Sequence, residues 1–189
     1  MKIGILGGSF DPPHFGHLLL ARQTREIVGL DEIWLMPYFA HSWDQTLSLV
    51  EDRLTMTRYI EEPGIVVSDE ETNQKAVNYT IDTVRRLKSK HHHKFYWIVG
   101  SDILGEFERW KDHDELLHEV PFLVFPRNGY PTPTTPPSGF QLIYSPDIIA
   151  SNISSTIVRK RLQRGHSVVG LVPEKVLSYI KDHKLYENH

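Results

Sequence analysis

The sequence predicts a single-domain α/β fold built on a doubly wound parallel sheet. Short apolar runs rich in β-forming residues alternate along the chain with segments of helical periodicity. The chain has 189 residues, the usual size of one domain, so residues 1–189 are expected to share one core. Strands that alternate with helices pair in parallel through right-handed crossovers, which places helices on both faces of one sheet.

Six short apolar runs are the expected strands. The first begins almost at the start of the chain, the second and fifth close at Pro37 and Pro126, and the fourth has the strongest strand pattern. Branched and aromatic residues fit a pleated sheet, and proline ends a strand because it lacks the N–H group that pairs. The expected strands are residues 2–6, 32–36, 65–67, 95–99, 122–125 and 140–144.

Six further segments predict helices. The first ends at Gly29, which suits a C-cap, and the second opens at Ser48, with Glu51 at capping-box spacing, and stops before Pro63. One apolar face of that second helix is expected to carry Leu49, Met56, Tyr59 and Ile60. The other expected helices are residues 18–28, 81–87, 112–118, 154–164 and 173–180, the last with Pro173 at its first position.

The connections between these elements are polar or rich in turn residues. Residues 128–139 combine Pro, Thr and Gly and predict a surface loop, because the chain after them completes the same sheet. The histidines at 91–93 suggest a metal site, but consecutive side chains diverge on a regular backbone. We therefore expect a solvated loop at these histidines.

Composition limits the classes of function. The net charge of -3 gives no general basic face for nucleic acid, so a nucleotide site must be local. The chain has no cysteine, which rules out disulfides, thiolate zinc sites and cysteine nucleophiles. No apolar run approaches the roughly 20 residues of a membrane span, and the start is too short for a signal peptide. We expect a cytoplasmic protein without a membrane or nucleic-acid partner, and a homo-oligomer stays open.

Residues 7–17, GGSFDPPHFGH, are the most informative stretch. Two glycines after a strand let backbone N–H groups approach a ligand, and the start of the next helix adds partial positive charge, which suits phosphate. His14 and His17 are three residues apart and could donate hydrogen bonds to one anion as charge builds up on it. A plain turn with surface histidines, or a metal site, would fit parts of the pattern, although no suitably spaced carboxylate accompanies the pair.

The complete stretch resembles the GG[ST]FDPxHxGH signature of the nucleotidyltransferase superfamily, with HxGH at residues 14–17. A second segment, residues 153–159, reads ISSTIVR. Taken alone it is an ordinary helix start, whose hydroxyls, free N–H groups and Arg159 could bind a polyphosphate. Together with the first motif it resembles the ISSTxxR motif of nicotinate and nicotinamide mononucleotide adenylyltransferases. That resemblance covers nearly the whole chain and implies a Rossmann-like fold.

Other segments resemble the same family. Residues 78–83 resemble its SYTxDT segment, and residues 100–102 resemble its G[AST]D segment. Trp110 matches a tryptophan that follows the G[AST]D segment, and Arg127 matches an arginine after the fifth strand. The resemblance implies that Asp102 binds ribose hydroxyls and that Thr80, with the neighbourhood of Trp110, lines the pyridine pocket. Stacking on a flat cationic ring is the physical reason that a tryptophan fits there.

The resemblance implies transfer of the adenylyl group of ATP to a pyridine mononucleotide in NAD biosynthesis, with release of pyrophosphate. The attacking phosphate oxygen is already anionic, so alignment and charge stabilisation suffice. Mg²⁺ is implied on the ATP phosphates, held by substrate oxygens and water, with no protein metal site. The implied catalytic residues are His14, His17 and Arg159. ATP is expected at Gly8, Ser9, Phe10, His14, His17, Gly100, Asp102, Ile153, Ser154, Ser155, Thr156 and Arg159, and the mononucleotide at Ser9, Phe10, Tyr79, Thr80, Asp102, Trp110 and Arg127.

One departure from the family concerns the acceptor. The bacterial nicotinate mononucleotide enzymes carry a PPHK segment, whereas residues 39–45 read FAHSWDQ here and residues 3–74 contain no lysine. If the family's lysine meets substrate phosphate, His41 or Arg53 must substitute for it, or the acceptor differs.

Two alternatives use the same scaffold: a pantetheine-phosphate adenylyltransferase and a catalytically silent nucleotide-binding regulator. The first usually has threonine where this chain has His14. The silent regulator is disfavoured because all three implied catalytic residues are present. Only a turnover assay separates binding from catalysis.

Overall fold

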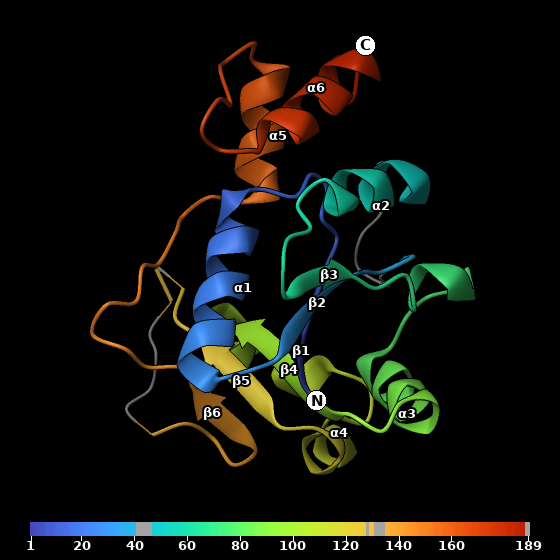
Figure 1. Ribbon diagram of the computed structural model, residues 1–189, viewed down its shortest axis with the longest axis vertical. Coiled ribbons are helices and arrows are strands. Elements are labelled where there is room, and N and C mark those ends of the chain that lie inside the picture. The colour runs from blue at the N-terminus through green and yellow to red at the C-terminus, as the bar shows by residue number, and fades with distance from the viewer. Residues whose placement is uncertain (41–46, 128, 131–134, 188–189) are drawn as a thin grey trace.

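A six-stranded parallel sheet forms the centre of the molecule in the computed structural model (Figure 1), which describes residues 1–40, 47–127, 129–130 and 135–187. The strands follow the spatial order β3-β2-β1-β4-β5-β6. Every neighbouring pair in this order is parallel. The chain therefore starts in the middle of the sheet and winds outward in both directions, which confirms the doubly wound α/β fold. The strands are β1 (Lys2–Gly8), β2 (Glu32–Pro37), β3 (Ile65–Val67), β4 (Lys94–Gly100), β5 (Phe122–Phe125) and β6 (Phe140–Leu142).

Helices cover both faces of this sheet. Successive side chains of a strand point to opposite faces, and accordingly Ile5 belongs to one apolar core and Leu6 to the other. The core that contains Leu6 is shared by α1 (Phe15–Val28), α2 (Val50–Arg58), α5 (Ser155–Gln163) and α6 (Glu174–Asp182). The core that contains Ile5 is shared by α3 (Thr80–Lys90) and α4 (His113–Glu119).

The strand order fixes where a ligand can bind. After β1 the chain builds β2 and β3 on one side, and it then crosses to place β4 on the other side of β1. Loops leave the carboxyl ends of β1 and β4 in opposite directions, so a crevice opens between them, as it does at such switch points in open parallel sheets. The glycines that end these two strands, Gly8 and Gly100, stand at this crevice.

Two helix starts differ from the sequence prediction. Helix α1 begins at Phe15, three residues earlier than predicted, because His14 acts as its N-cap residue. The expected capping box at Ser48 is wrong. Helix α2 starts at Val50 without a side-chain cap, and the backbone N–H of Ser48 donates to Asp11 Oδ2 at 3.3 Å. Leu49 is also not part of the apolar face, since 72% of its surface is exposed.

Smaller differences occur elsewhere. Strand β6 ends at Leu142, although the N–H of Ile143 still donates to the carbonyl of Val124 at 2.9 Å. Pro173 is the N-cap residue of α6 instead of its first helical residue. Short 3₁₀ helices, which the sequence did not predict, follow β3 and β4: η1 (Thr72–Gln74), η2 (Ser101–Gly105) and η3 (Phe107–Arg109).

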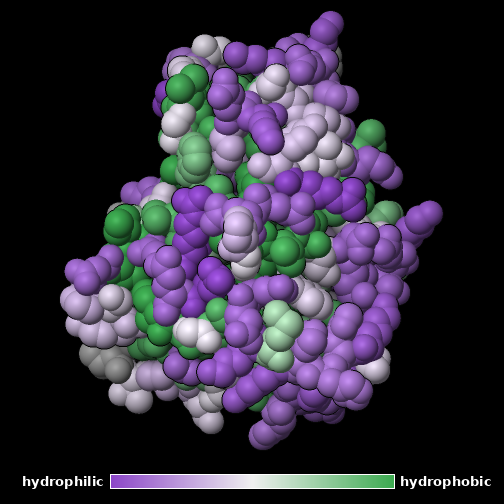
Figure 2. Space-filling model, in the orientation of Figure 1, coloured by the Kyte–Doolittle hydropathy of each residue, from purple (hydrophilic) through white to green (hydrophobic). Residues whose placement is uncertain are grey.

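The surface in Figure 2 is largely hydrophilic, with hydrophobic side chains gathered in patches between the charged ones. Residues 91–93 form a loop as predicted, but the rings of His91 and His93 pack edge-on against Trp34, with centroids 5.4 and 6.3 Å away. These two histidines are therefore less solvated than expected. Among the described residues, no helix has the length and apolar character needed to cross a bilayer.

Candidate active site

A cleft of about 600 Å³ opens at the carboxyl ends of β1 and β4. Both sequence motifs line it: residues of the first loop and α1 on one side, and the segment that leads into α5 next to them. Residues from the α3 start and from the connection after β4 complete the wall. Of the predicted site residues, those that line the cleft are Gly8, Ser9, His14, His17, Tyr79, Thr80, Gly100, Asp102, Trp110, Arg127, Ile153, Ser154, Ser155, Thr156 and Arg159.

The two motif histidines form a stacked pair. Their ring centroids are 3.7 Å apart, and the ring of the buried Phe10 supports His17 at 4.7 Å. The backbone N–H of His14 donates to Nδ1 of His17 at 3.2 Å. An imidazole nitrogen that accepts a hydrogen bond carries no proton, so the neutral ring of His17 must hold its proton on Nε2. His17 therefore presents an N–H donor at Nε2.

Both imidazoles are neutral at physiological pH in the ligand-free protein. Burial lowers the pKa of His14 to about 4, with a further contribution from the positive charge of Arg127. Burial also holds the pKa of His17 well below its usual value, helped by His14 and Arg127. Such a site favours an anion, because negative charge from a ligand offsets the cost of placing positive charge there. The pair thus suits a phosphate group better than a cation.

The start of α5 lies directly against the first motif. Ser155 Oγ donates to the carbonyl of Pro12 at 2.8 Å, and Arg159 Nη1 donates to the carbonyl of Asp11 at 2.6 Å. The other N–H groups of Arg159 make no hydrogen bond with a described residue. A guanidinium with N–H donors still available, next to the N-terminus of a helix, is a typical phosphate-binding site.

Gly16 permits this close approach of the two motifs. A Cβ atom at this position would lie 2.9 Å from His14 Nδ1 and 3.1 Å from the carbonyl oxygen of Ile153. Both distances are shorter than normal van der Waals contact. The glycine between the two histidines therefore brings the α1 start and the segment before α5 into contact.

Asp102 and Arg127 form an ion pair at the end of β4 and β5. Arg127 Nη1 donates to Asp102 Oδ2 at 2.7 Å, whereas the buried Oδ1 has no partner among the described residues. Gly100 leaves room for this carboxylate, because a Cβ there would lie 2.2 Å from Asp102 Oδ1. A buried acceptor without a partner is costly, so Oδ1 is ready to accept a hydroxyl group of a ligand.

The opposite wall of the cleft is aromatic and partly basic. Tyr79 is the N-cap residue of α3 and exposes 41% of its surface. Lys111 Nζ lies 4.8 Å from the centroid of the Tyr79 ring and donates to Asp82 at 2.9 Å. The Trp110 ring packs on Phe107, with centroids 5.5 Å apart, and lines the cleft. A flat ring can stack against such a wall.

Two predicted residues have other roles. Phe10 lies fully buried outside the cleft wall, so only its backbone remains available to a ligand. The hypothesis that Arg53 replaces the family's lysine is wrong, because its buried guanidinium donates to the carbonyls of Ser48, Ser9 and Phe39 at 3.2, 2.9 and 3.0 Å. His41, the other candidate, lies outside the described residues.

Comparisons with known proteins identify the family of this chain. The model of the cytidylyltransferase-like family matches residues 5–161. A "Probable nicotinate-nucleotide adenylyltransferase" from Lactiplantibacillus plantarum is 38% identical over 100% of this chain and 89% of its own. One of the same name from Oceanobacillus iheyensis is 38% identical over 98% of this chain and 96% of its own. This chain belongs to the nicotinate-nucleotide adenylyltransferase family.

A solved adenylyltransferase has the same fold. The nicotinic acid mononucleotide adenylyltransferase of Plasmodium falciparum, solved in complex with NaAD, superimposes with a TM-score of 0.84 over 98% of this chain and 97% of its own, at 23% identity. That identity is low, so the likeness concerns the Rossmann-like fold alone. The family membership and the fold confirm the resemblance drawn from the two motifs.

Three residues in or beside this candidate site were missed by sequence reasoning. Asp11 is part of the first motif, but nothing local indicates that Arg159 and Tyr186 would both bind to it. Glu71 and Lys111 line the cleft from segments that read as polar connections. Glu71 belongs to a run of carboxylates well before the helix predicted at residues 81–87, and no local signal distinguished it. Within the described residues, no group of three or more histidine or carboxylate side chains is arranged to hold a metal ion.

Proposed function

We propose that this protein transfers the adenylyl group of ATP to nicotinate mononucleotide, forming nicotinate adenine dinucleotide and pyrophosphate. The observation that carries the proposal is the meeting of His14, His17 and Arg159 around one cleft in a chain of the nicotinate-nucleotide adenylyltransferase family. The two relatives named above carry that activity in their names, and the Plasmodium falciparum protein was solved with NaAD. The same reaction yields NAD directly when the acceptor is nicotinamide mononucleotide.

The chemical step is one displacement at phosphorus. An oxygen of the 5′-phosphate of the mononucleotide forms a bond to the α-phosphorus of ATP. The bond from that phosphorus to the oxygen bridging to the β-phosphorus breaks, and this oxygen leaves with the pyrophosphate. No proton needs to be removed from the nucleophile, so the protein has to align the two phosphates and stabilise charge.

The protein groups divide this work between them. Nε2–H of His17 donates to a phosphate oxygen of ATP, and His14 lies against it in the same pair. The N–H groups at the start of α5, with the open part of the Arg159 fork, bind the phosphates that leave. The bound triphosphate raises the pKa of both imidazoles, so that positive charge can develop as the leaving group becomes more negative. ATP enters as its magnesium complex, and the ion is held by phosphate oxygens and water.

Ribose and pyridine groups occupy the rest of the cleft. Asp102 Oδ1, which has no partner in the described structure, accepts a ribose hydroxyl. The pyridine ring of the acceptor stacks within the wall that contains Tyr79, Thr80 and Trp110. Ser9 and Arg127 also line the cleft and are available to the acceptor phosphate. The single catalytic domain over residues 1–189 and the homo-oligomer remain predictions.

The test is an acceptor panel. The purified protein is incubated with MgATP and, separately, with nicotinate mononucleotide, nicotinamide mononucleotide or phosphopantetheine, and products are separated by chromatography. We expect the dinucleotide of nicotinate mononucleotide together with an equal amount of pyrophosphate. Product from phosphopantetheine alone would assign the chain to the alternative enzyme. No product from any acceptor would favour a nucleotide-binding protein without turnover.

A further inference from the structure

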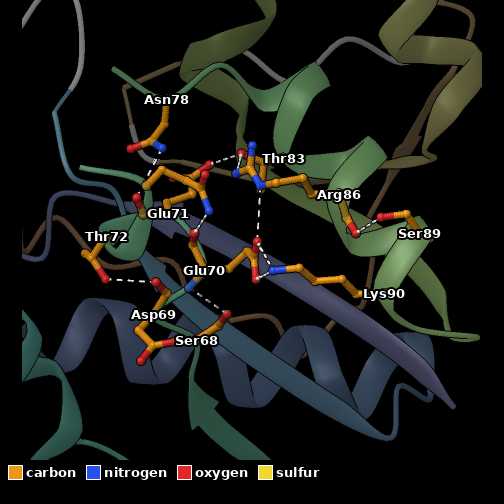
Figure 3. A network of polar contacts seen from close by, with 11 residues as sticks. Ser68, Asp69, Glu70, Glu71, Thr72, Asn78, Thr83, Arg86, Ser89 and Lys90 are labelled. Carbon is orange, nitrogen blue, oxygen red and sulfur yellow. Dashed lines mark hydrogen bonds and ion pairs between the residues drawn. The ribbon is translucent and has the colours of Figure 1, made fainter. Parts of the chain in front are cut away.

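A buried carboxyl group that this reaction does not use lines the α3 side of the cleft. Glu71 stands between β3 and α3 and exposes only 5% of its surface. Its backbone carbonyl accepts a hydrogen bond from Asn78 Nδ2 at 3.2 Å (Figure 3). Asn78 is followed directly by Tyr79 and Thr80, which line the same cleft. Glu71 therefore belongs to the wall that surrounds the proposed pyridine pocket.

One oxygen of this carboxyl group is bonded and the other is available. Oε1 of Glu71 accepts the hydroxyl of Thr83 at 2.7 Å, and that hydroxyl accepts Arg86 Nη2 at 3.2 Å. The second oxygen makes no hydrogen bond with a described residue. The neighbouring cations are engaged by Glu70, which binds Arg86 Nε at 3.1 Å and Lys90 Nζ at 2.9 Å (Figure 3). Among the described residues, Glu71 thus has no ion pair of its own.

This environment makes both protonation states accessible near neutral pH. Burial raises the pKa of Glu71 to about 7, and the charge of Glu70 adds to the rise. The hydrogen bond from Thr83 and the charge of Arg86 act in the opposite direction. A protonated carboxyl group donates a hydrogen bond, whereas an ionised one only accepts.

We propose that the Glu71 carboxyl group contacts the substituent on the pyridine ring of the acceptor mononucleotide and distinguishes a carboxylate from a carboxamide. In its protonated form it donates to the carboxylate of nicotinate, and in its ionised form it accepts from the carboxamide N–H of nicotinamide. The ionised form repels the nicotinate carboxylate at the same place. This inference rests on the proposed function and adds the residue that sets the choice between the two acceptors.

Other charged groups of the cleft do not produce the same pH dependence. Lys111 faces the pocket from the connection before α4, and its pKa is raised by the hydrogen bond to Asp82, so it stays cationic. Arg109 lines the same wall and is always charged. Glu70, Arg86 and Lys90 are joined in ion pairs. The charges of these groups therefore add no pH dependence to the choice between the two acceptors.

The experiment measures kcat/KM for nicotinate and nicotinamide mononucleotide at saturating MgATP from about pH 6 to about pH 8 and takes their ratio. Effects on ATP and on the acceptor 5′-phosphate are common to both acceptors and cancel. We expect the ratio to fall by about tenfold for each pH unit across this range, because the protonated fraction of Glu71 serves one acceptor and the ionised fraction serves the other. In Glu71→Gln the ratio should not vary with pH, because an amide does not titrate.

Two further variants separate this role from a structural one. Thr83→Val keeps the side-chain shape but removes the hydrogen bond that favours the ionised carboxylate, so the whole curve of the ratio against pH should be displaced to higher pH. Glu115→Gln is the matched control, since Glu115 is exposed, binds Arg85 at 2.7 Å and lies outside the cleft wall. Its ratio should follow the wild-type curve.

The outcomes distinguish this inference from the proposed function. A wild-type ratio that is flat across the pH range overturns the role of Glu71, and this result does not depend on any variant folding. A pH-dependent ratio that is unchanged in Glu71→Gln overturns it as well. Absence of product from both acceptors refutes the proposed function and the inference together.

Discussion

A single methyl group at Gly16 should disturb the active site more than the fold. In Gly16→Ala the new Cβ would lie 2.9 Å from His14 Nδ1 and 3.1 Å from the backbone oxygen of Ile153. The His14 ring cannot simply swing away, because it is 5% exposed and stacked on His17 at 3.7 Å. The first motif and the segment before α5 must therefore move apart by a few tenths of an ångström.

The magnitudes decide which property changes. Alanine is favoured over glycine within a helix by about 1 kcal/mol, and overpacking a tight contact costs about 1–3 kcal/mol. The free energy of unfolding should therefore fall by no more than about 2 kcal/mol. Misplacement of catalytic groups by up to 1 Å can cost roughly 100-fold in rate, so kcat should fall much more than stability.

The assay compares kcat with thermal unfolding in Gly16→Ala and in a control, Gly105→Ala. Gly105 is exposed, and a Cβ there would meet no atom within 4 Å. The control should keep wild-type kcat. Unchanged kcat in Gly16→Ala would refute the claim that this contact sets the geometry of the two motifs.

Four other changes test separate contacts. His17→Ala removes a donor to the transition state and should lower kcat by roughly 100-fold or more with little change in the KM for ATP; unaltered turnover would exclude His17 from the mechanism. Arg159→Lys should also impair turnover because the planar fork is lost, whereas full activity in steady-state assays would show that a point charge suffices. Tyr186→Phe removes the 2.6 Å hydrogen bond to the buried Asp11 carboxylate, so urea unfolding should show a loss of about 1.5–3 kcal/mol; equal stability would contradict the importance of this contact. The folded-state pKa of His14, about 4, lies below the ordinary value of 6.5 for histidine, so only the unfolded chain gains a proton as pH falls between these values. The resulting loss of stability, about 3 kcal/mol, should be absent in His14→Gln, and parallel pH curves for the two proteins would contradict the burial of this group.

Local patterns were sufficient to predict the fold. Apolar runs that end at glycine or proline located the strands, and their alternation with helices implied the parallel sheet that the structure shows. The meeting of residues 14–17 with residues 153–159 was also expected, because both motifs belong to one known site. The motifs did not reveal which contact holds the two segments together. It is the hydrogen bond from Arg159 to the carbonyl of Asp11, two residues that are 148 positions apart in the sequence.

The failures share one physical cause. Ser48 has the right spacing for a capping box, but a tertiary contact with Asp11 replaces the local one. Arg53 was a candidate to replace the family's lysine at the substrate phosphate, yet three backbone carbonyls hold it in the interior. Glu71 reads as part of an acidic connection, and its burial and its partners, which the sequence does not show, distinguish it from Glu70. Long-range packing determines each of these roles, and a local pattern does not contain it.

The most direct test of the account is a crystal structure of the protein with a non-hydrolysable ATP analogue and nicotinate mononucleotide. We predict that Nε2 of His17, the first N–H groups of α5 and the Arg159 guanidinium all lie about 3 Å from oxygens of the same triphosphate. The pyridine ring should lie beside Trp110. A triphosphate bound elsewhere in the cleft, or one in contact with only one of the two motifs, would contradict the account.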